Sequence, residues 1–195
     1  MSNIIDGMTN LFNKKHFESQ LQKKVQEAER GGIPLSLIEF DIDKFKAIND
    51  AEGLGHAVGD VVIKTVVSIV RSHIRQTDFF ARVGGEEFAL LFFGDVVGAE
   101  TLARKVREEV EMTMKKVAAE YDFAALLGRD TVTISVGVAT YYGRNGSFSN
   151  ADAKKVAVEL HQAADKAQYV SKNSGRNRVT VAKPLNAPLE PILSS

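Results

Sequence analysis

The sequence predicts an α+β fold, an α/β sandwich built on a ferredoxin-like βαββαβ core with an additional C-terminal helix and strand. Short apolar runs of strand length alternate along the chain with longer segments whose apolar residues recur at helical spacing. A Gly84-Gly85 pair separates two of the short runs, as in a hairpin. After a first helix, the elements therefore run strand, helix, strand, strand, helix, strand, and then one more helix and strand.

The N-terminal part begins with an amphipathic helix over residues 14–30. Phe17, Leu21 and Val25 recur there at helical spacing, and Gly31-Gly32 ends the helix. Pro34 precedes a mostly apolar run from 35 to 42, which is short enough for a buried strand. A second helix, from 58 to about 75, carries an apolar stripe of β-branched residues, so it depends on packing more than on propensity. The stripe consists of Val58, Val62, Val66, Ile69 and Val70.

The hairpin is expected from two short apolar strands, residues 79–83 and 86–93, on either side of Gly84-Gly85. A two-residue link of this composition is typical of a type I′ turn, which needs a positive φ at both positions. We therefore expect both glycines in the left-handed region.

The C-terminal part alternates in the same way. Residues 97–120 are expected to form a helix, 131–140 a strand, 152–173 a helix that stops before Gly175, and 178–182 a last short strand. Residues 1–182 are thus expected to form one domain. Residues 183–195 hold three of the four prolines and are expected to be a disordered tail.

Composition limits the function. The chain has 195 residues, 44% of them hydrophobic, which suits one domain with a sizeable core. Twenty-five basic and 25 acidic residues balance to a net charge of zero, so a nucleic-acid polymer is not favoured as a partner. The chain has no cysteine, which excludes disulfides and thiolate zinc sites, and its four histidines lack ligand-like spacing.

Nothing in the sequence indicates export or membrane insertion. Residues 1–6 contain no basic segment followed by an apolar stretch, as a signal peptide would. The most apolar region, 58–70, is short and is broken by Asp60 and Lys64. A cytoplasmic location is expected, either for the chain alone or for the cytoplasmic part of a larger, membrane-bound protein.

Acidic residues stand at the end of the first predicted strand. Asp41 and Asp43 are two residues apart, so in extended geometry both point to one face. The alternative is that Asp43 caps the following turn and Asp41 is solvated. Taken alone, the pair favours neither interpretation.

The hairpin adds two adjacent carboxylates, Glu86 and Glu87. Carboxylates that converge near low-dielectric surface repel one another, and either take up protons or bind a cation. Oxygen ligands with open positions suit Mg²⁺, which combines one or two carboxylates with substrate phosphates. The alternative is a surface hairpin whose acids keep its edge soluble.

Basic residues suit a polyanionic ligand. Lys46 follows the acidic strand end, and Lys172 and Arg176 flank the end of the last long helix. For the latter two, the alternative is an ordinary interaction with the helix dipole next to a glycine cap. Together with the carboxylates they favour a phosphate-binding metal enzyme over a plain binding module.

At this level of detail the chain resembles the GGDEF-domain diguanylate cyclases, which condense two GTP molecules into cyclic di-GMP and have a nucleotidyl-cyclase and polymerase-palm-like fold. The resemblance covers nearly the whole chain, in six ordered motifs. They are Asp6-Gly-Met-Thr-Asn-Leu-Phe-Asn13, Phe40-Asp-Ile-Asp-Lys-Phe-Lys-Ala-Ile-Asn-Asp50, Gly55-His-Ala-Val-Gly-Asp60, Arg82-Val-Gly-Gly-Glu-Glu-Phe88, Thr133-Ile-Ser-Val-Gly-Val-Ala139 and Tyr169-Val-Ser-Lys-Asn-Ser-Gly-Arg-Asn177.

The resemblance implies a role for each matching residue. A divalent metal, Mg²⁺ or Mn²⁺, would be held by Asp41, the carbonyl of Ile42, Glu86 and Glu87. Glu86 would also accept the proton of the attacking 3′-hydroxyl, and Lys46 would stabilise charge on the phosphates. The substrate-binding set would be Asn49 and Asp60 for guanine, Gly84 and Gly85 beside the triphosphate, and Lys172 and Arg176 on the terminal phosphates.

The resemblance also implies regulation and partners. Arg75-Gln-Thr-Asp78 is similar to the Arg-x-x-Asp product-inhibition site found at this spacing in many family members. The expected partners are GTP, cyclic di-GMP as product and inhibitor, a second copy of the chain in a transient homodimer, and an upstream sensory or receiver domain that this chain lacks.

Two segments depart from the family pattern. Ala51-Glu52-Gly53-Leu54 is two residues longer than usual between the guanine-reading positions, and residues 121–130 are long, with no chemistry assigned. Two rival functions stand beside the cyclase. One is a weak or inactive domain that binds GTP or cyclic di-GMP and signals by contact, and the other is a related cyclase acting on ATP. Asp60 argues against ATP, because adenine lacks the donor pair that guanine offers.

Overall fold

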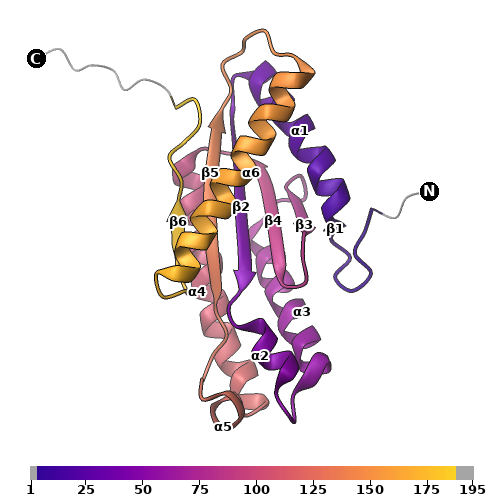
Figure 1. Ribbon diagram of the computed structural model, residues 1–195, viewed down its shortest axis with the longest axis vertical. Coiled ribbons are helices and arrows are strands. Elements are labelled where there is room, and N and C mark those ends of the chain that lie inside the picture. Colours follow the sequence, from indigo (N-terminus) through magenta and orange to yellow (C-terminus); the bar gives the residue numbers. More distant parts are fainter. Residues whose placement is uncertain (1–3, 188–195) are drawn as a thin grey trace, which may run out of the picture.

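A computed structural model describes residues 4–187 and contains one six-stranded sheet (Figure 1). The strands are β1 (Phe12–Asn13), β2 (Pro34–Ile42), β3 (Phe79–Arg82), β4 (Glu87–Phe93), β5 (Ile134–Tyr142) and β6 (Val179–Val181). The helices are α1 (Lys14–Gly31), α2 (Phe45–Asp50), α3 (Gly55–His73), α4 (Val96–Glu120), α5 (Phe123–Leu127) and α6 (Asn150–Asn173).

The strand order confirms the ferredoxin-like core. The sheet runs β1-β3-β4-β2-β5-β6, so the four core strands lie in the order β3-β4-β2-β5. The central strand β2 is antiparallel to both neighbours, β4 and β5. The additional helix and strand, α6 and β6, extend the sheet beyond β5, to which β6 is parallel.

Helices cover both faces of the sheet, which gives a three-layer sandwich (Figure 1). Alternate residues of β2 face opposite sides. Ile38, Phe40 and Ile42 pack with α3 and α4, whereas Leu35 and Leu37 pack with α1 and α6. The sheet is thereby buried on both faces, and the end of β2 emerges between the two helical layers.

Local signals set the helix ends. Asn13 accepts a hydrogen bond from the backbone N–H of His16 (3.1 Å) at the start of α1. Gly32 ends that helix with φ of 58°. Ser149 and Asp152 form a capping box at the start of α6.

The hairpin expectation was wrong in its details. The link between β3 and β4 spans residues 83–86, and neither Gly84 nor Gly85 has φ in the left-handed region. Instead, the backbone N–H groups of Val83 and Gly84 both donate to the carbonyl oxygen of Glu87, at 2.9 and 3.2 Å. Neither glycine is therefore needed for a type I′ turn, and only at Gly84 would an added β-carbon meet a neighbour.

The tail expectation also changes for the residues that the structure describes. Leu185 pairs with β5, where its N–H donates to Thr140 (2.8 Å) and its carbonyl accepts from Tyr142 (3.0 Å). The remainder of the expected tail, residues 188–195, lies outside the described residues. Within residues 4–187, no helix has the length and apolar character that crossing a membrane requires.

Candidate active site

The register of β2 and β4 brings the predicted carboxylates together. Asp41 lies directly opposite Glu87 on the neighbouring strand, and the N–H of Ile42 donates to the carbonyl of Glu86 (3.2 Å). Directly opposed residues of antiparallel strands project on the same face, with Cβ atoms about 5 Å apart. The pairing, more than the twist of a tight turn, thus places Asp41 and Glu87 together and Glu86 beside them.

Asp41 is buried in an unfavourable position for a negative charge. Its residue is 8% exposed, and burial raises the pKa of its carboxyl to about 6, with a further increase from the charges of Glu86 and Glu87. Lys172 opposes this rise, because its Nζ lies 2.8 Å from Asp41 Oδ2. The carboxylate group therefore has a cationic partner here, and that partner is an ammonium group from the end of α6.

Asp43 has a different role from Asp41. Its carboxylate accepts hydrogen bonds from the hydroxyls of Thr133 and Ser135, both at 2.6 Å, and from the backbone N–H of Asn177 (3.1 Å). Asp43 is thus a buried tie between the end of β2, the start of β5 and the loop after α6. It does not cap α2, whose N-cap position is Lys44 and makes no side-chain capping bond.

Gly84 gives room to Glu87. A β-carbon at Gly84 would lie 2.2 Å from Glu87 Oε2, whereas one at Gly85 would have nothing within 4 Å. The Glu87 side chain therefore folds over the backbone of Gly84. The open space at Gly85 is compatible with close approach of a ligand to the backbone.

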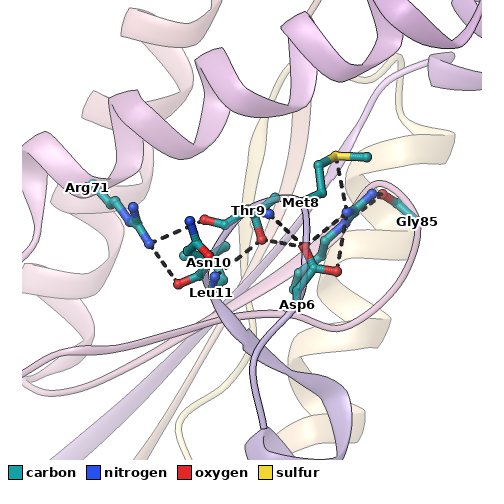
Figure 2. A network of polar contacts seen from close by, with 8 residues as sticks. Asp6, Met8, Thr9, Asn10, Leu11, Arg71 and Gly85 are labelled. Atoms are coloured by element: carbon teal, nitrogen blue, oxygen red, sulfur yellow. Dashed lines mark hydrogen bonds and ion pairs between the residues drawn. The ribbon is translucent and has the colours of Figure 1, made fainter. Parts of the chain in front are cut away.

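An arginine missed by the sequence reasoning holds the turn from behind. Arg82 donates to the carbonyl of Gly85 through both Nε (3.1 Å) and Nη2 (2.6 Å), and to Asp6 Oδ1 through Nη1 (3.2 Å) (Figure 2). Asp6 also accepts from the N–H and hydroxyl of Thr9, and these contacts lower its pKa against the opposing effect of burial. The N-terminal loop is thus bonded to the turn that carries the candidate ligands.

The same loop is held on its other side by α3. Arg71 Nη2 donates to the carbonyls of Thr9 (3.4 Å) and Asn10 (3.0 Å) (Figure 2). Asn10 has φ of 55°, a conformation that asparagine tolerates better than most residues. Asparagine therefore fits the left-handed conformation of this loop position.

The two predicted guanine-reading residues lie on α2 and α3, which are in contact. Asn49 is on α2 and Asp60 is in the second turn of α3. A β-carbon at Gly59 would lie 2.2 Å from Asn49 Oδ1, so α2 and α3 are in close contact there. Asn49 Oδ1 is buried, and among the described residues it has no hydrogen-bond partner. An unpaired buried acceptor suits a ligand that offers an N–H donor.

The predicted phosphate-binding cations lie at two places around the carboxylates. Lys46 is exposed on α2, and Arg176 is exposed just after α6, with φ of 63°. Lys172, as described, is paired with Asp41. Of these three residues, only Lys172 contacts a carboxylate of the site directly among the contacts that the structure records.

Arg75 and Asp78 lie apart from this site, at the exit of α3. Asp78 Oδ2 accepts from the backbone N–H of Arg75 (2.8 Å), and no ion pair joins the two side chains. Both residues line a pocket of about 320 Å³ between α3 and the N-terminal loop, together with Asn10 and Arg71. A simple ion pair between the two side chains at the helix exit is therefore not what the structure contains.

A second buried carboxylate lies two residues before Asp41. Glu39 is 5% exposed, and its Oε1 lies 3.0 Å from Nε2 of His161 on α6. Burial raises the pKa of Glu39, and the hydrogen bond to Glu39 raises the pKa of His161. Sequence reasoning missed this pair, because an isolated histidine on a helix gives no sign of the strand residue that it faces.

The carboxylate oxygens of the site suit a divalent cation, provided that the ion replaces Lys172 as the partner of Asp41. In the described part of the chain, no three acidic or histidine side chains are already grouped around a metal position. However, Asp41 is a buried carboxylate with a raised pKa whose cationic partner is a lysine. Hard oxygen donors of this kind are the ligands that Mg²⁺ prefers.

The family model for "Diguanylate cyclase, GGDEF domain" matches residues 3–178. Among curated proteins, the "Probable diguanylate cyclase DgcT" of Escherichia coli strain K12 is 39% identical over 93% of this chain and 36% of its own length. Diguanylate cyclase A of Treponema denticola is 36% identical over 91% of this chain and 44% of its own length. The chain thus spans less than half the length of these curated relatives.

Solved structures agree. The GGDEF domain of DgcB from Caulobacter crescentus, solved in complex with c-di-GMP, matches with a TM-score of 0.72 and 34% identity, over 93% of this chain and 96% of that one. Diguanylate cyclase SiaD from Pseudomonas aeruginosa, solved with its activator SiaC, matches with a TM-score of 0.71 and 29% identity, over 92% and 62%.

Proposed function

Because the chain belongs to the GGDEF domain family of diguanylate cyclases, we propose that it condenses two molecules of GTP into cyclic di-GMP. Each ribose 3′-hydroxyl attacks the α-phosphorus of the other nucleotide. Two new P–O bonds form, two α–β phosphoanhydride bonds break, and two pyrophosphates leave together with the two hydroxyl protons.

One observation carries the proposal. Asp41 and Glu87 are opposed on adjacent strands, with Glu86 next to them, and the pKa of Asp41 is raised to about 6. A purely structural carboxylate would gain nothing from being buried beside two others. A site that exchanges Lys172 for another cation accounts for all of these features.

The proposed ligands of a divalent ion, Mg²⁺ or Mn²⁺, are Asp41, the carbonyl of Ile42, Glu86 and Glu87. When bound, such an ion supplies charge stabilisation to the phosphates, of the order of several kcal/mol in the transition state. Glu86 would accept the proton of the attacking 3′-hydroxyl, because a carboxylate beside the reacting atoms can act as a general base.

The proposed substrate contacts surround these carboxylates. Lys46 would stabilise negative charge on the phosphates as the pyrophosphate leaves, and Lys172 and Arg176 would hold the terminal phosphates. Gly84 and Gly85 would let the backbone approach the triphosphate, a role that the open space at Gly85 supports.

Guanine would be read by Asn49 and Asp60. The unpaired Oδ1 of Asn49 supports this role, because a buried acceptor is costly unless a ligand donates to it. A carboxylate at Asp60 can accept from the N1–H and N2–H groups of guanine. Adenine has no such pair of donors, so the proposed substrate is GTP and not ATP.

The direct test is product identification. The purified chain is incubated with Mg²⁺ and either GTP or ATP, and the products are identified by mass. Cyclic di-GMP and pyrophosphate from GTP, with no cyclic dinucleotide from ATP, are expected. Binding of GTP or cyclic di-GMP without turnover would instead favour the contact-signalling function, and turnover of ATP would favour the related cyclase.

We also propose that the product inhibits the enzyme at Arg75 and Asp78. The pocket that these residues line supports the proposal, as does the availability of the Arg75 guanidinium for a phosphate or a guanine edge. Replacing Arg75 with alanine is expected to weaken cyclic di-GMP binding and to relieve inhibition, while initial turnover of GTP stays close to that of the parent. Inhibition curves with added product measure this, and equal inhibition of both proteins would contradict it.

The proposed assembly is a transient homodimer, because each domain offers one triphosphate site and the product contains two nucleotides. An upstream sensory or receiver domain is the proposed source of regulation. GTP as substrate implies that the domain faces the cytoplasm, either alone or within a larger membrane-bound protein.

A further inference from the structure

The segment after α4, residues 121–133, is anchored firmly although it is mostly loop. Phe123 on α5 and Val132 are fully buried, and the hydroxyl of Thr131 donates to the carbonyl of Glu111 on α4 (2.9 Å). Gly128 ends α5 with φ of 63°. The residue that follows, Arg129, therefore extends from a fixed base.

Arg129 reaches the turn that follows β2. Its Nη1 donates to the carbonyl of Asp43 (3.2 Å) and its Nη2 to the carbonyl of Lys44 (3.3 Å). The guanidinium is partly buried, and burial lowers its pKa against the opposing effect of the Asp43 charge. A fork with two donors suits two successive carbonyl groups in a way that a single ammonium group does not.

The turn that Arg129 holds is strained. Lys44 has φ of 55°, which costs a non-glycine residue of order 1 kcal/mol and persists only where surrounding contacts impose it. Besides Arg129, those contacts come from Asp43, whose N–H donates to the carbonyl of Thr133 (2.8 Å) and whose carboxylate binds Thr133, Ser135 and Asn177.

This turn joins the two groups of proposed catalytic residues. On one side are Asp41 and the carbonyl of Ile42, and on the other is α2, which carries Lys46 and Asn49. A rotation of the Asp43–Lys44 peptide would move Lys46 relative to Ile42. The backbone conformation of this turn therefore decides whether Lys46 and the carbonyl of Ile42 lie at the same triphosphate.

The far end of α2 is bordered by the same segment. A β-carbon at Gly53 would lie 3.8 Å from Cδ1 of Leu126 on α5, so the segment contacts the loop that is two residues longer than the family usually has. Figure 1 shows α5 and the connection between α2 and α3 at one end of the molecule. The segment 121–133 therefore borders both ends of α2. Arg129 binds the turn before the helix, and Leu126 lies beside the loop after it.

We propose that Arg129 is a positioning residue for the cyclase reaction, which holds the Asp43–Lys44 turn so that Ile42 and Lys46 address one triphosphate. The inference rests on the proposed function. Arg129 itself touches no reacting atom, so its effect passes through the backbone of the turn.

The test compares Arg129→Met, which keeps the length of the side chain and removes the donors, with Arg129→Lys, which keeps one donor group. Arg30→Met is the matched control, because Arg30 is an exposed arginine in the last turn of α1. In each protein, amide hydrogen exchange over residues 43–50 is measured alongside kcat and KM for GTP.

In Arg129→Met, exchange over residues 43–50 is expected to accelerate while the strands of the sheet keep their protection. We expect kcat to fall at least about tenfold, since a displacement of 1 Å can cost about a hundredfold. KM should change by less than about threefold, because the lost interaction acts in the transition state. Arg129→Lys should lie between parent and Arg129→Met, and Arg30→Met should match the parent.

Faster exchange with an unchanged kcat would reduce Arg129 to a structural contact and overturn the proposal. Unchanged exchange over residues 43–50 would overturn it too, whatever the activity. If the parent chain made no cyclic di-GMP, the proposed function would fail. The exchange comparison would still decide whether Arg129 holds the turn.

Discussion

At the scale of single residues, Asp41 shows how a proposed site for a cation would weaken the protein that carries it. Its pKa of about 6 in the folded chain, against an ordinary value of 3.8, means that folding disfavours the ionised form. The sign follows from linkage: the folded state holds a proton that the unfolded state releases, so stability is lost as pH rises from about 4 to about 6. Above this window the destabilisation is complete.

Replacing Asp41 with asparagine should therefore abolish turnover and stabilise the protein. At pH 8 without divalent metal, we expect the free energy of unfolding to rise by about 1–3 kcal/mol, since each unit of pKa shift corresponds to about 1.4 kcal/mol and the pKa of about 6 already includes the opposing effect of Lys172. Denaturant unfolding and a cyclase assay measure the two effects.

Glu87→Gln tests the predicted loss of turnover at a second proposed metal ligand. It should lose turnover as Asp41→Asn does, because it removes a proposed metal ligand. Near-normal product formation by either variant at saturating Mg²⁺ would refute the assignment of the ligands.

His161 gives the protein a separate dependence on pH. Its pKa is raised above 6.5, first by the hydrogen bond to Glu39 and also by the charges of Glu39 and Asp165, against burial and Lys14. The stability that the raised pKa of His161 contributes is present below pH 6.5 and is lost as pH rises through its folded-state pKa. Unfolding free energies at pH 6 and pH 8.5 should differ less in His161→Gln than in the parent. An equal difference in both proteins would contradict this.

The site residues that sequence reasoning found are those whose spacing along one strand or turn carries the signal. Asp41, Glu86 and Glu87 stand out in this way, and the register of β2 and β4 places Asp41 opposite Glu87, with Glu86 next to Glu87 in the chain. Arg82, Glu39 and Arg129 were missed, because each acts on a partner that is distant in sequence or, for Arg82, on a carbonyl without any side-chain signal.

At the scale of elements, the link between β3 and β4 depends on one missing side chain. A β-carbon at position 84 would meet the Glu87 carboxylate at 2.2 Å, so that side chain has to move. The proposed ligand set then loses its arrangement while the strands remain paired.

Gly84→Ala should accordingly lower cyclase activity by about a hundredfold, as expected for a displacement of about 1 Å at the reacting centre. In the absence of nucleotide, the Mg²⁺ concentration that gives half of the thermal shift should rise. Gly85→Ala is the control, since its β-carbon meets nothing within 4 Å, and it should keep the parent's response to Mg²⁺ alone. Equal responses of all three proteins would contradict this role of Gly84.

The long elements could be predicted and the short ones could not. Helices α1, α3, α4 and α6 have apolar stripes over several turns, so their period is clear in the sequence. Strand β1 has two residues and exists because it pairs with β3, while α2 and α5 have six and five residues. Such elements are set by tertiary contacts, which no local pattern records.

At the scale of the whole molecule, the sheet order could be predicted because a split βαβ arrangement leaves few alternatives. The order β3-β4-β2-β5 puts β2 in the centre, between the hairpin that carries Glu86 and Glu87 and the strand that binds Asp43. What the order cannot reveal is how a second copy of the domain would face the first.

The proposed reaction needs two nucleotides bound to two domains, so specific activity should rise with enzyme concentration. Two identical sites that face each other across a two-fold axis form an isologous contact. Cyclase assays from nanomolar to high micromolar enzyme measure this directly. Constant specific activity over the whole range would show that one chain suffices.

The ion pair between Lys172 and Asp41 makes ligand entry an exchange of partners. In the proposed site, Lys172 would hold a terminal phosphate only after it releases Asp41, and Asp41 would bind a metal only after it is released. Each of these events removes the obstacle to the other, so nucleotide and divalent ion should bind with positive cooperativity, each raising the affinity for the other by the same factor. An ion alone, or a nucleotide without metal, would have to break the ion pair and leave one of its two charges without a partner. The ligand-free site should therefore favour a complex of nucleotide and metal over either ligand alone.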